Sequence, residues 1–517
     1  MKKSFLRKIM PALLLGLSVM MIPMQTLAKT KKVDIDTSIE QDRDAGRELY
    51  DSKCYYHNAL PLNISISDGS DASVLHDERY STSLSLSEGC EIKVASDTTM
   101  SGLYVIWDSI VPEWTLKIGE DSYTYGKYGY LHEYIELPKE TTELTIVIPN
   151  GANDVERGIS KMRIADIIAF DTKDLPAWVQ VWEPVCEEAD FLVFSTHADD
   201  EQLFFGGILP VYQSERNIRV QYAFFTTYWN IPDQHIREHE KLNGLWLAGC
   251  RYYPIMGHFD DGWADNYEQA AAAISEDEAQ KYLTECIRRT HPQIVVTQDI
   301  EGEYGHGQHM FMTGNVIKAV ELAKDETYDG DSLSKYGTWD TLKFYIHLYG
   351  ENQMKFDMRS PLDTFGGKRA IDVARQAYLC HQSQQWCDFS VNDYGPYDAA
   401  LYGLYSTKVG EDVNHDDFME NIVSYDEQAE LKRLEEERIA KEEEERALEE
   451  AEKARLEAQK KAEEEEVEPE KEKKGLSFEE IFVLSAVLLG VLMTVGFAVI
   501  FVKMQNDKKA KRKRRRR

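Results

Sequence analysis

Cysteine is scarce in this sequence, with seven residues in 517, and no two of them form a Cys-x-x-Cys pair. This spacing argues against a zinc ribbon, and the low density argues against a scaffold held by many disulfides. Bridges between Cys54 and Cys90 or between Cys380 and Cys387 are one interpretation, and buried thiols are the other. Because the number is odd, at least one cysteine stays unpaired within the chain. The other three are Cys186, Cys250 and Cys286.

Positive charge is also scarce, since 59 lysines and arginines stand against 91 aspartates and glutamates, for a formal net charge of −32. Proteins that bind nucleic acid or anionic lipid neutralise phosphates with basic patches. The acidic body of this chain therefore argues against nucleic acid as a partner. It suits a protein that handles neutral or cationic material, and solubility alone is the alternative explanation.

Two apolar runs lie near the ends of the sequence. Residues 1–28 combine a basic start, an apolar stretch around Leu13–Met24 and a small terminal residue, which predicts a cleaved signal peptide. Residues 481–502 carry no charge and can span a bilayer, which takes about 20 apolar residues. The basic tail 503–517 follows, and the positive-inside rule places such a tail in the cytoplasm. We therefore predict a single-pass protein of a bacterial cell membrane with its body outside the cell.

Residues 29–176 alternate apolar and polar positions, as in Leu103, Val105 and Trp107, with turn residues at short intervals. This pattern is typical of an all-β sandwich. Secreted hydrolases often carry such modules for carbohydrate binding, and that is one interpretation of this domain. Its aromatic residues would then form a sugar-stacking platform, with packing inside the sandwich as the alternative: Trp114, Tyr123, Tyr125, Tyr128 and Tyr130.

From residue 186 onward, strand-like apolar runs alternate with helix-like segments. This alternation predicts an α/β domain over 186–425, with a Rossmann-like, mostly parallel sheet and helices on both faces. Residues 426–474 are almost entirely Glu, Lys, Arg and Ala without an apolar heptad, which predicts a solvated helical stalk or spacer. The expected strands are 191–195, 220–226, 252–256, 294–297 and 342–349, and the expected helices cover 235–248, 276–290 and a segment from His309.

Two polar clusters follow two of the expected strands. His197-Ala-Asp-Asp-Glu201 comes directly after the run 191–195. Gly305-His-Gly-Gln-His309 follows the run 294–297. Parallel sheets place their ligands at the carboxyl ends of strands, so we expect the two clusters to converge. Histidine and aspartate bind hard or borderline metal ions, and an open fourth position holds water, so the combination predicts a hydrolase.

At these residues the chain resembles the PIG-L/LmbE-like family of zinc-dependent N-acetylglucosaminyl deacetylases. The family motifs read His-Pro-Asp-Asp-Glu and His-Pro-Asp-His, and here they read His-Ala-Asp-Asp-Glu and His-Gly-Gln-His. The resemblance covers about residues 186–425. It includes the segment 237–240 on an expected helix, Asp261 before Gly262, and the segment 381–384.

The resemblance implies one zinc ion per chain, with His197, Asp200 and His309 as its ligands. Asp199 would be the general base, because zinc lowers the pKa of its bound water toward ~7 and a nearby carboxylate can complete the deprotonation. His306 would stabilise the tetrahedral oxyanion or protonate the leaving amine. His309 is expected to stay neutral, as a metal ligand must.

Four further residues are candidates for substrate binding, each with a structural alternative: Arg237, Glu240, Asp261 and Tyr304. In the family such an arginine reaches the sugar, whereas an ion pair between Arg237 and Glu240 is the alternative. Asp261 would accept a sugar hydroxyl, or else serve as a turn residue. Tyr304 would assist at the oxyanion, or else pack. Glu201 would brace the turn after its strand.

The sequence departs from the family motifs at two positions. Ala198 replaces a proline, which is expected to loosen the turn without removing a ligand. Gln308 replaces an aspartate that would orient a histidine and raise its basicity. Glutamine accepts a hydrogen bond but carries no charge, so His306 is expected to be a weaker proton donor and acceptor, or a purely electrostatic stabiliser.

These observations predict a membrane-anchored deacetylase that hydrolyses the N-acetyl group of an amino sugar in a glycan or glycoconjugate. Water on zinc would attack the acetamide carbonyl, and acetate and a free amine would leave. Hydrolysis of another N-acyl amide on the same scaffold is the alternative among enzymes. A catalytically weak surface protein that binds glycans is the alternative from another class, and Gln308 is the residue in its favour.

Overall fold

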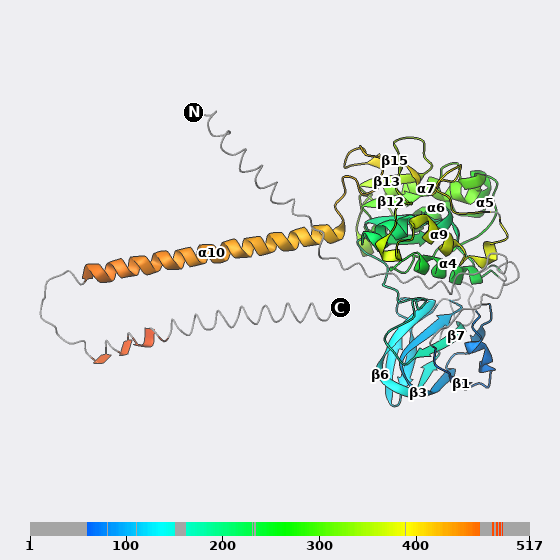
Figure 1. Cartoon of the computed structure of the whole chain (residues 1–517), viewed down its shortest axis with the longest axis horizontal. Helices are drawn as coiled ribbons and strands as arrows, with labels where there is room; N and C mark the ends of the chain where they lie inside the picture. Colours follow the sequence, from blue (N-terminus) through cyan, green and yellow to red (C-terminus); the bar gives the residue numbers. More distant parts are fainter. Residues whose placement is uncertain are drawn as a thin grey trace. The chain divides into compact units, whose positions relative to one another are not determined.

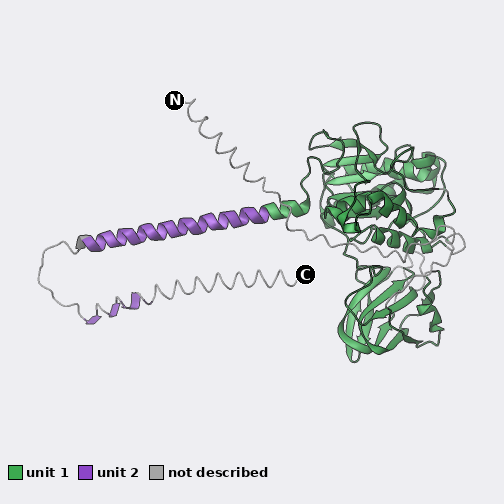
Figure 2. Cartoon of the chain, in the orientation of Figure 1, with its two compact units in different colours: residues 1–431 green, residues 432–517 purple. Residues whose placement is uncertain are grey.

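The computed structural model describes residues 59–79, 81–109, 111–149, 162–229, 231, 234–387 and 389–465, with scattered positions between 478 and 489. The expected signal peptide, Cys54 and the basic tail 503–517 lie outside these residues. The chain divides into two compact units, Met1–Leu431 and Lys432–Arg517 (Figure 2). The first unit holds an antiparallel domain, here called the β domain, and an α/β domain.

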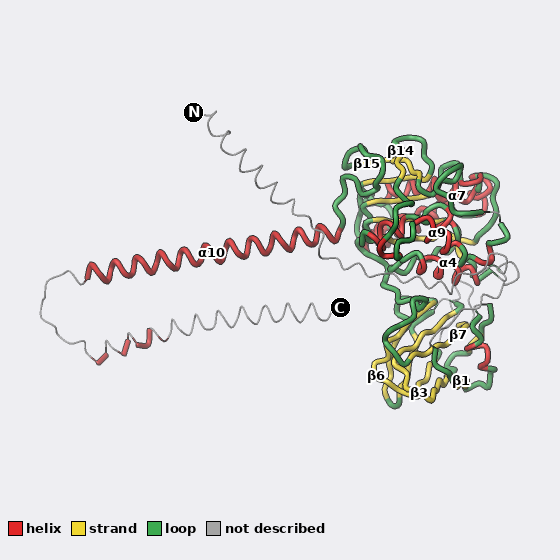
Figure 3. The backbone as a smooth tube through the Cα atoms, in the orientation of Figure 1, coloured by secondary structure: helices red, strands yellow, loops and turns green. Residues whose placement is uncertain are grey.

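The β domain is a seven-stranded antiparallel sheet in the order β2-β7-β3-β6-β4-β5, with β1 paired to β3 (Figures 1 and 3). Alternate side chains point into its core, such as Ile92 and Val94 of β3 and Leu144 and Ile146 of β6. The strands are β1 (Asn63–Ile66), β2 (Leu84–Leu86), β3 (Glu91–Trp107), β4 (Trp114–Ile118), β5 (Asp121–Tyr125), β6 (His132–Val147) and β7 (Met162–Phe170).

The predicted sandwich is corrected by this topology, because all seven strands belong to one curled sheet rather than to two facing sheets. Strands β3 and β6 are 17 and 16 residues long, and their register shifts between Ala95 and Met100 and again before Gly102. Such irregularities bend long strands, so the sheet curls over its own apolar face. Period-two alternation identifies strands, but it does not say how many sheets they form.

The α/β domain has a six-stranded sheet in the order β14-β15-β13-β12-β8-β9. Strands β9, β8, β12 and β13 pair in parallel, whereas β15 is antiparallel to both β13 and β14. The strands are β8 (Phe191–Ser195), β9 (Val220–Phe224), β12 (Ile294–Thr297), β13 (Lys343–His347), β14 (Gln353–Lys355) and β15 (Leu401–Thr407). Strands β10 (Thr226–Thr227) and β11 (Phe259–Asp260) form a separate two-stranded parallel sheet.

Helices cover both faces of the six-stranded sheet. Phe191 and Val193 of β8 enter a core shared with α4 and α9, whereas Leu192 and Phe194 enter a second core shared with α6 and α7. The main helices are α3 (Asp200–Leu203), α4 (Ile236–Leu247), α5 (Tyr267–Ala273), α6 (Glu276–Thr290), α7 (Gly307–Leu322), α8 (Gly330–Tyr336) and α9 (Ala370–Tyr378).

The predicted fold class is therefore wrong for this chain. The largest sheet is curled and antiparallel, and the six-stranded sheet is mixed, whereas the expected sheet was Rossmann-like and mostly parallel. The expected strand 252–256 forms isolated bridges at Tyr252 and Ile255, and β15 was not expected at all. Apolar runs show where a strand can form, but its direction depends on how the intervening chain returns to the sheet.

Among the residues that the structure describes, no helix is both long and apolar enough to cross a membrane. The prediction of a transmembrane helix, and with it of a single-pass membrane protein, is corrected to this extent: the described residues do not support it. Of the expected span 481–502, only scattered residues are described. Helix α10 (Tyr425–Glu465) lies in the expected charged segment, and its side chains from 431 to 463 are exposed.

The described cysteines form no disulfide with one another, which excludes a bridge between Cys380 and Cys387 in this structure. Five of them are buried and Cys387 is half-buried. The interpretation as buried thiols is therefore the better one for these positions: Cys90, Cys186, Cys250, Cys286 and Cys380.

The β domain packs on helix α4 through a buried polar network. His132 Nε2 lies 2.9 Å from His239 Nδ1, and His239 Nε2 lies 3.3 Å from Asp108 Oδ1. The ring of Tyr130 lies 4.6 Å from that of Tyr253 in the α/β domain. Of the expected sugar platform only Tyr128 is exposed, and the other members are buried or half-buried, which favours packing: Trp114, Tyr123, Tyr125 and Tyr130.

Candidate metal centre

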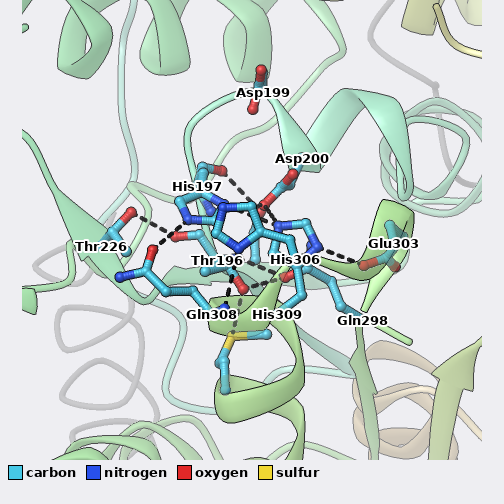
Figure 4. A network of polar contacts seen from close by, with 12 residues as sticks. Thr196, His197, Asp199, Asp200, Thr226, Gln298, Glu303, His306, Gln308 and His309 are labelled. Atoms are coloured by element: carbon cyan, nitrogen blue, oxygen red, sulfur yellow. Dashed lines mark hydrogen bonds and ion pairs between the residues drawn. The ribbon is translucent and has the colours of Figure 1, made fainter. Parts of the chain in front are cut away.

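A sharp turn between β8 and α3 carries the first cluster. Asp199 has a φ of 109°, a backbone conformation that side chains rarely adopt. Its backbone N–H donates to Glu201 Oε2 at 2.7 Å. Arg237 Nη2 donates to the carbonyl oxygen of Ala198 at 2.6 Å. Held in this way, the turn sends the consecutive carboxylates of Asp199 and Asp200 in different directions (Figure 4).

Three buried donor atoms, here called the donor triangle, meet beside this turn. His197 Nδ1 lies 3.0 Å from His309 Nε2, and Asp200 Oδ2 lies 3.1 Å from each of these nitrogens (Figure 4). Zinc takes nitrogen and oxygen ligands at about 2.0–2.2 Å, which suits donor atoms at this spacing. The other oxygen, Asp200 Oδ1, is buried without a hydrogen-bond partner among the described residues. The residues present therefore fit a metal ion.

His306 lies against the donor triangle. The ring nitrogens of His197, His306 and His309 come within 4.8 Å of one another, a wider group than the triangle with Asp200. His306 Nδ1 accepts a hydrogen bond from the backbone N–H of Gln308 at 3.1 Å, at the start of α7. Burial lowers the pKa of His306 to about 2, so the ring is neutral and its proton sits on Nε2.

Both histidines of the donor triangle are oriented by a partner on the far side of the ring. The side-chain oxygen of Gln308 lies 2.8 Å from His197 Nε2, and Glu303 Oε2 lies 2.8 Å from His309 Nδ1. Each partner accepts the proton of the outer nitrogen, which leaves the inner nitrogen a lone pair for a metal. The side chain of Gln308 therefore acts on His197 and not, as the motif predicts, on His306.

Glu303 is a residue of the site that sequence reasoning missed. Its other oxygen lies 2.7 Å from His347 Nδ1, so one buried carboxylate bridges two imidazoles. Burial acts to raise the pKa of Glu303, but hydrogen bonds from His309 and His347 outweigh it and lower that pKa to about 2. Burial acts to lower the pKa of His309, but Asp200 and Glu303 outweigh it and raise that pKa to about 10. The negative field at the donor triangle thus favours a cation, and where no cation is bound it protonates His309, contrary to the neutral ring expected from the sequence.

Asp199 lies beside a buried arginine rather than in the donor triangle. Its Oδ1 is 3.7 Å from Arg237 Nη2, and Arg237 Nη1 donates to Asp261 Oδ2 at 2.9 Å. Burial raises the pKa of Asp199 to about 7 and outweighs the charge of Arg237, which acts to lower it. Asp261 Oδ1 lies 3.5 Å from His197 Nε2. The structure thus brings Asp199, Arg237 and Asp261 together at one edge of the metal centre.

The two remaining candidates for substrate binding differ in their surroundings. Tyr304 lies at the metal centre, with its ring centre 5.3 Å from that of His309. Glu240 is instead engaged with Ser383, accepting from its backbone N–H at 2.8 Å and from its hydroxyl at 2.6 Å. Its carboxylate therefore ties helix α4 to the segment 381–385.

Residues 192–320 match the family model described as GlcNAc-PI de-N-acetylase (PIG-L). The resemblance is thereby confirmed for this part of the expected domain 186–425, and residues 192–320 form a PIG-L family domain. The matched segment contains both motifs and all three residues of the donor triangle.

Two similar curated proteins share the name 1D-myo-inositol 2-acetamido-2-deoxy-alpha-D-glucopyranoside deacetylase. The protein from Segniliparus rotundus is 36% identical over 135 residues, which are 25% of this chain and 38% of the relative. The protein from Streptomyces griseus subsp. griseus is 41% identical over 60 residues, which are 12% of this chain and 19% of the relative. The chain thus spans less than half the length of these two relatives.

Among solved structures, the N,N'-diacetylchitobiose deacetylase from Pyrococcus horikoshii aligns with 16% identity and a TM-score of 0.30. The alignment covers 38% of this chain and 71% of that protein.

Proposed function

We propose that this protein is a metal-dependent hydrolase that removes the N-acetyl group from a GlcNAc-type amino sugar in a glycan or glycoconjugate. The observation that carries the proposal is the donor triangle, in which two oriented imidazoles and one carboxylate lie 3.0 to 3.1 Å apart. Asp199, a carboxylate outside the triangle but next to Asp200, supplies a candidate base. The PIG-L match over 192–320 supports the same class of reaction.

His197, Asp200 and His309 would hold one zinc ion, which supplies Lewis acidity and lowers the pKa of a water ligand toward ~7. In this proposal Asp199 accepts a proton from the attacking water and returns it to the leaving amine. His306 carries its proton on Nε2, so it donates a hydrogen bond to the oxygen that becomes negative at the acetamide carbonyl.

The sugar ring would bind at the edge formed by Arg237 and Asp261. Arg237 is fixed there by Asp261 and by the carbonyl oxygen of Ala198, so its guanidinium keeps one orientation. Tyr304, which lies two residues before the second motif, would help to stabilise the oxyanion that forms at the acetamide carbonyl. Glu240 acts as a positioning residue, because its carboxylate is bound to Ser383.

The test measures acetate release by the full chain from methyl N-acetylglucosaminide and from chitin oligomers, with metal content determined in parallel. Asp199→Asn is expected to keep the ion and to lower kcat by about 100-fold or more, as removal of a general base does. Asp331→Asn makes the same change at an exposed position of α8 and should leave kcat unchanged.

Two outcomes would contradict the proposal. One is acetate release that is the same in Asp199→Asn as in the unmodified protein. The other is no acetate from any N-acetylated amino sugar by a protein that holds one ion per chain.

A further inference from the structure

Trp263 is exposed although it stands beside the buried metal centre. Its side chain is 68% exposed, and its ring centre lies 4.6 Å from that of His306, edge to face. The ring is nearly parallel to Tyr304, with an interplanar angle of 15° and a separation of 6.3 Å. Asp261, two residues earlier, already reaches the metal centre. An open aromatic face therefore borders the place where an acetamide carbonyl would lie.

The indole is held in one orientation. Its Nε1–H donates to Asp265 Oδ1 at 2.7 Å. The loop that carries it is fixed to the second motif on both sides of Trp263. Gly262 N donates to the side-chain oxygen of Gln308 at 3.3 Å. Gly307 N donates to the carbonyl oxygen of Ala264 at 2.7 Å. A binding surface that is rigid beforehand loses little conformational entropy when a ligand binds.

The surroundings of the indole suit a sugar ring. An exposed ring adds little to folding, because apolar groups stabilise a fold when they are buried. A flat aromatic face can pack against the apolar face of a pyranose, as aromatic residues in ligand sites do. The carboxylate of Asp265 lies at the edge of the indole and is exposed, so it can accept hydrogen bonds from sugar hydroxyl groups.

We propose that Trp263 forms a second sugar subsite, which binds the ring next to the acetamido sugar that is hydrolysed. The inference rests on the proposed function and adds that the substrate is a glycan or glycoside with at least two rings. Since the exposed indole lies against the ring of His306, a sugar ring stacked on it would lie beside the reacting sugar. Trp263 is thus a specificity residue for longer substrates.

The kinetic test compares Trp263→Ala and Trp263→Phe with the full unmodified chain on methyl N-acetylglucosaminide, N,N'-diacetylchitobiose and its trimer. Trp263→Ala is expected to raise KM for the dimer and trimer about tenfold, the effect of ~1.4 kcal/mol of lost binding. KM for the single-ring glycoside and all kcat values should change less than about twofold, and Trp263→Phe should recover most of the loss. Tyr394→Ala removes an exposed aromatic elsewhere in the α/β domain and should change none of these constants.

A binding test separates failure of the subsite from failure of the proposed function. N,N'-diacetylchitobiose is titrated calorimetrically into Asp199→Asn and into Asp199→Asn with Trp263→Ala. Weaker binding in the double variant supports the subsite, even if no acetate is released. Equal KM values for the dimer in Trp263→Ala and the unmodified chain, or equal binding in the two titrated variants, overturn the subsite and leave the deacetylase proposal standing.

Discussion

Two single residues orient the histidines of the donor triangle, and they differ in charge. Gln308 offers a neutral oxygen to His197, whereas Glu303 offers a carboxylate to His309. A carboxylate raises the basicity of the imidazole that it binds more than an amide does. The two nitrogen donors are therefore unequal in basicity. The weaker donor, His197, depends on the amide of Gln308, a residue that departs from the family motif.

The first prediction concerns Gln308. Replacing it with leucine removes the acceptor for His197 Nε2–H, so the ring loses its fixed tautomer and orientation. We expect Gln308→Leu to bind zinc about 10- to 100-fold more weakly, the usual effect of losing such a partner. Competition with a coloured chelator measures the affinity. Gln353→Leu, at an exposed position of β14, should bind zinc normally, and an equal affinity in Gln308→Leu would show that the amide does not support the metal site.

The sequence motifs predicted the residues that meet at the donor triangle but not Glu303. His197, Asp200 and His309 lie in two short segments after strands, where the chemistry of each residue type is visible in the sequence. Glu303 acts only because the chain folds back over residues 302–306, with Tyr304 at a φ of 48°. No periodicity or motif in the sequence indicates that the backbone reverses here or that it buries the side chain of Glu303.

At the scale of elements, the turn between β8 and α3 places the proposed general base, Asp199, in a strained backbone conformation. Asp199 occupies a conformation suited to glycine, and its carboxylate is buried. Such strain costs about 1–3 kcal/mol and persists where the surrounding contacts hold it. The hydrogen bonds from Asp199 N to Glu201 and from Arg237 to Ala198 are those contacts.

The second prediction isolates this strain by comparing two variants that both lose the carboxylate. We expect Asp199→Gly to unfold at a higher temperature than Asp199→Ala, because glycine adopts this φ without strain. The free energy of unfolding should differ by roughly 1 kcal/mol. Both variants should lose activity equally. Differential scanning calorimetry measures the difference.

The same pair of substitutions at Asp331 serves as the control. In helix α8 glycine is less favourable than alanine by about 1 kcal/mol, so the order of stability should reverse there. If Asp199→Ala is as stable as Asp199→Gly, the turn is not strained.

The strands at the centre of the α/β domain were predictable and their surroundings were not. Residues 191–195 and 294–297 form β8 and β12 as expected, because short apolar runs bounded by polar residues mark buried strands. The antiparallel pairing of β15 and the curl of β3 and β6 were missed. Both depend on contacts between segments far apart in the sequence.

At the scale of the whole first unit, helix α4 belongs to two domains. Arg237 points to the metal centre, whereas Ile236 and His239 pack against the β domain. Burial lowers the pKa of His132 well below its usual value, with the charge of His239 acting in the same direction. The contact between the domains therefore holds a neutral histidine.

The third prediction follows from that neutral histidine. In the unfolded chain His132 takes up a proton near pH 6.5, while in the folded protein it stays neutral, so the unfolded state binds more protons as the pH falls. Stability should therefore decrease below about pH 6.5, by up to ~1.4 kcal/mol per pH unit from this residue. Thermal unfolding of the full chain between pH 7 and pH 5 measures the slope.

His132→Gln should show a shallower decrease than the unmodified chain over this range. His76→Gln removes an exposed histidine of the same domain and should leave the slope as it is. An unchanged slope in His132→Gln would mean that His132 does not contribute to the pH dependence.

The contacts of helix α4 with both domains also predict which residues vary together among homologues. A lineage that exchanged the β domain for another module would leave His239 facing a new surface, with its partners His132 and Asp108 gone. We therefore expect these three residues to be inherited as a set, kept or replaced together across homologues. Arg237, on the same helix but facing the metal centre, should persist whether or not the β domain is present.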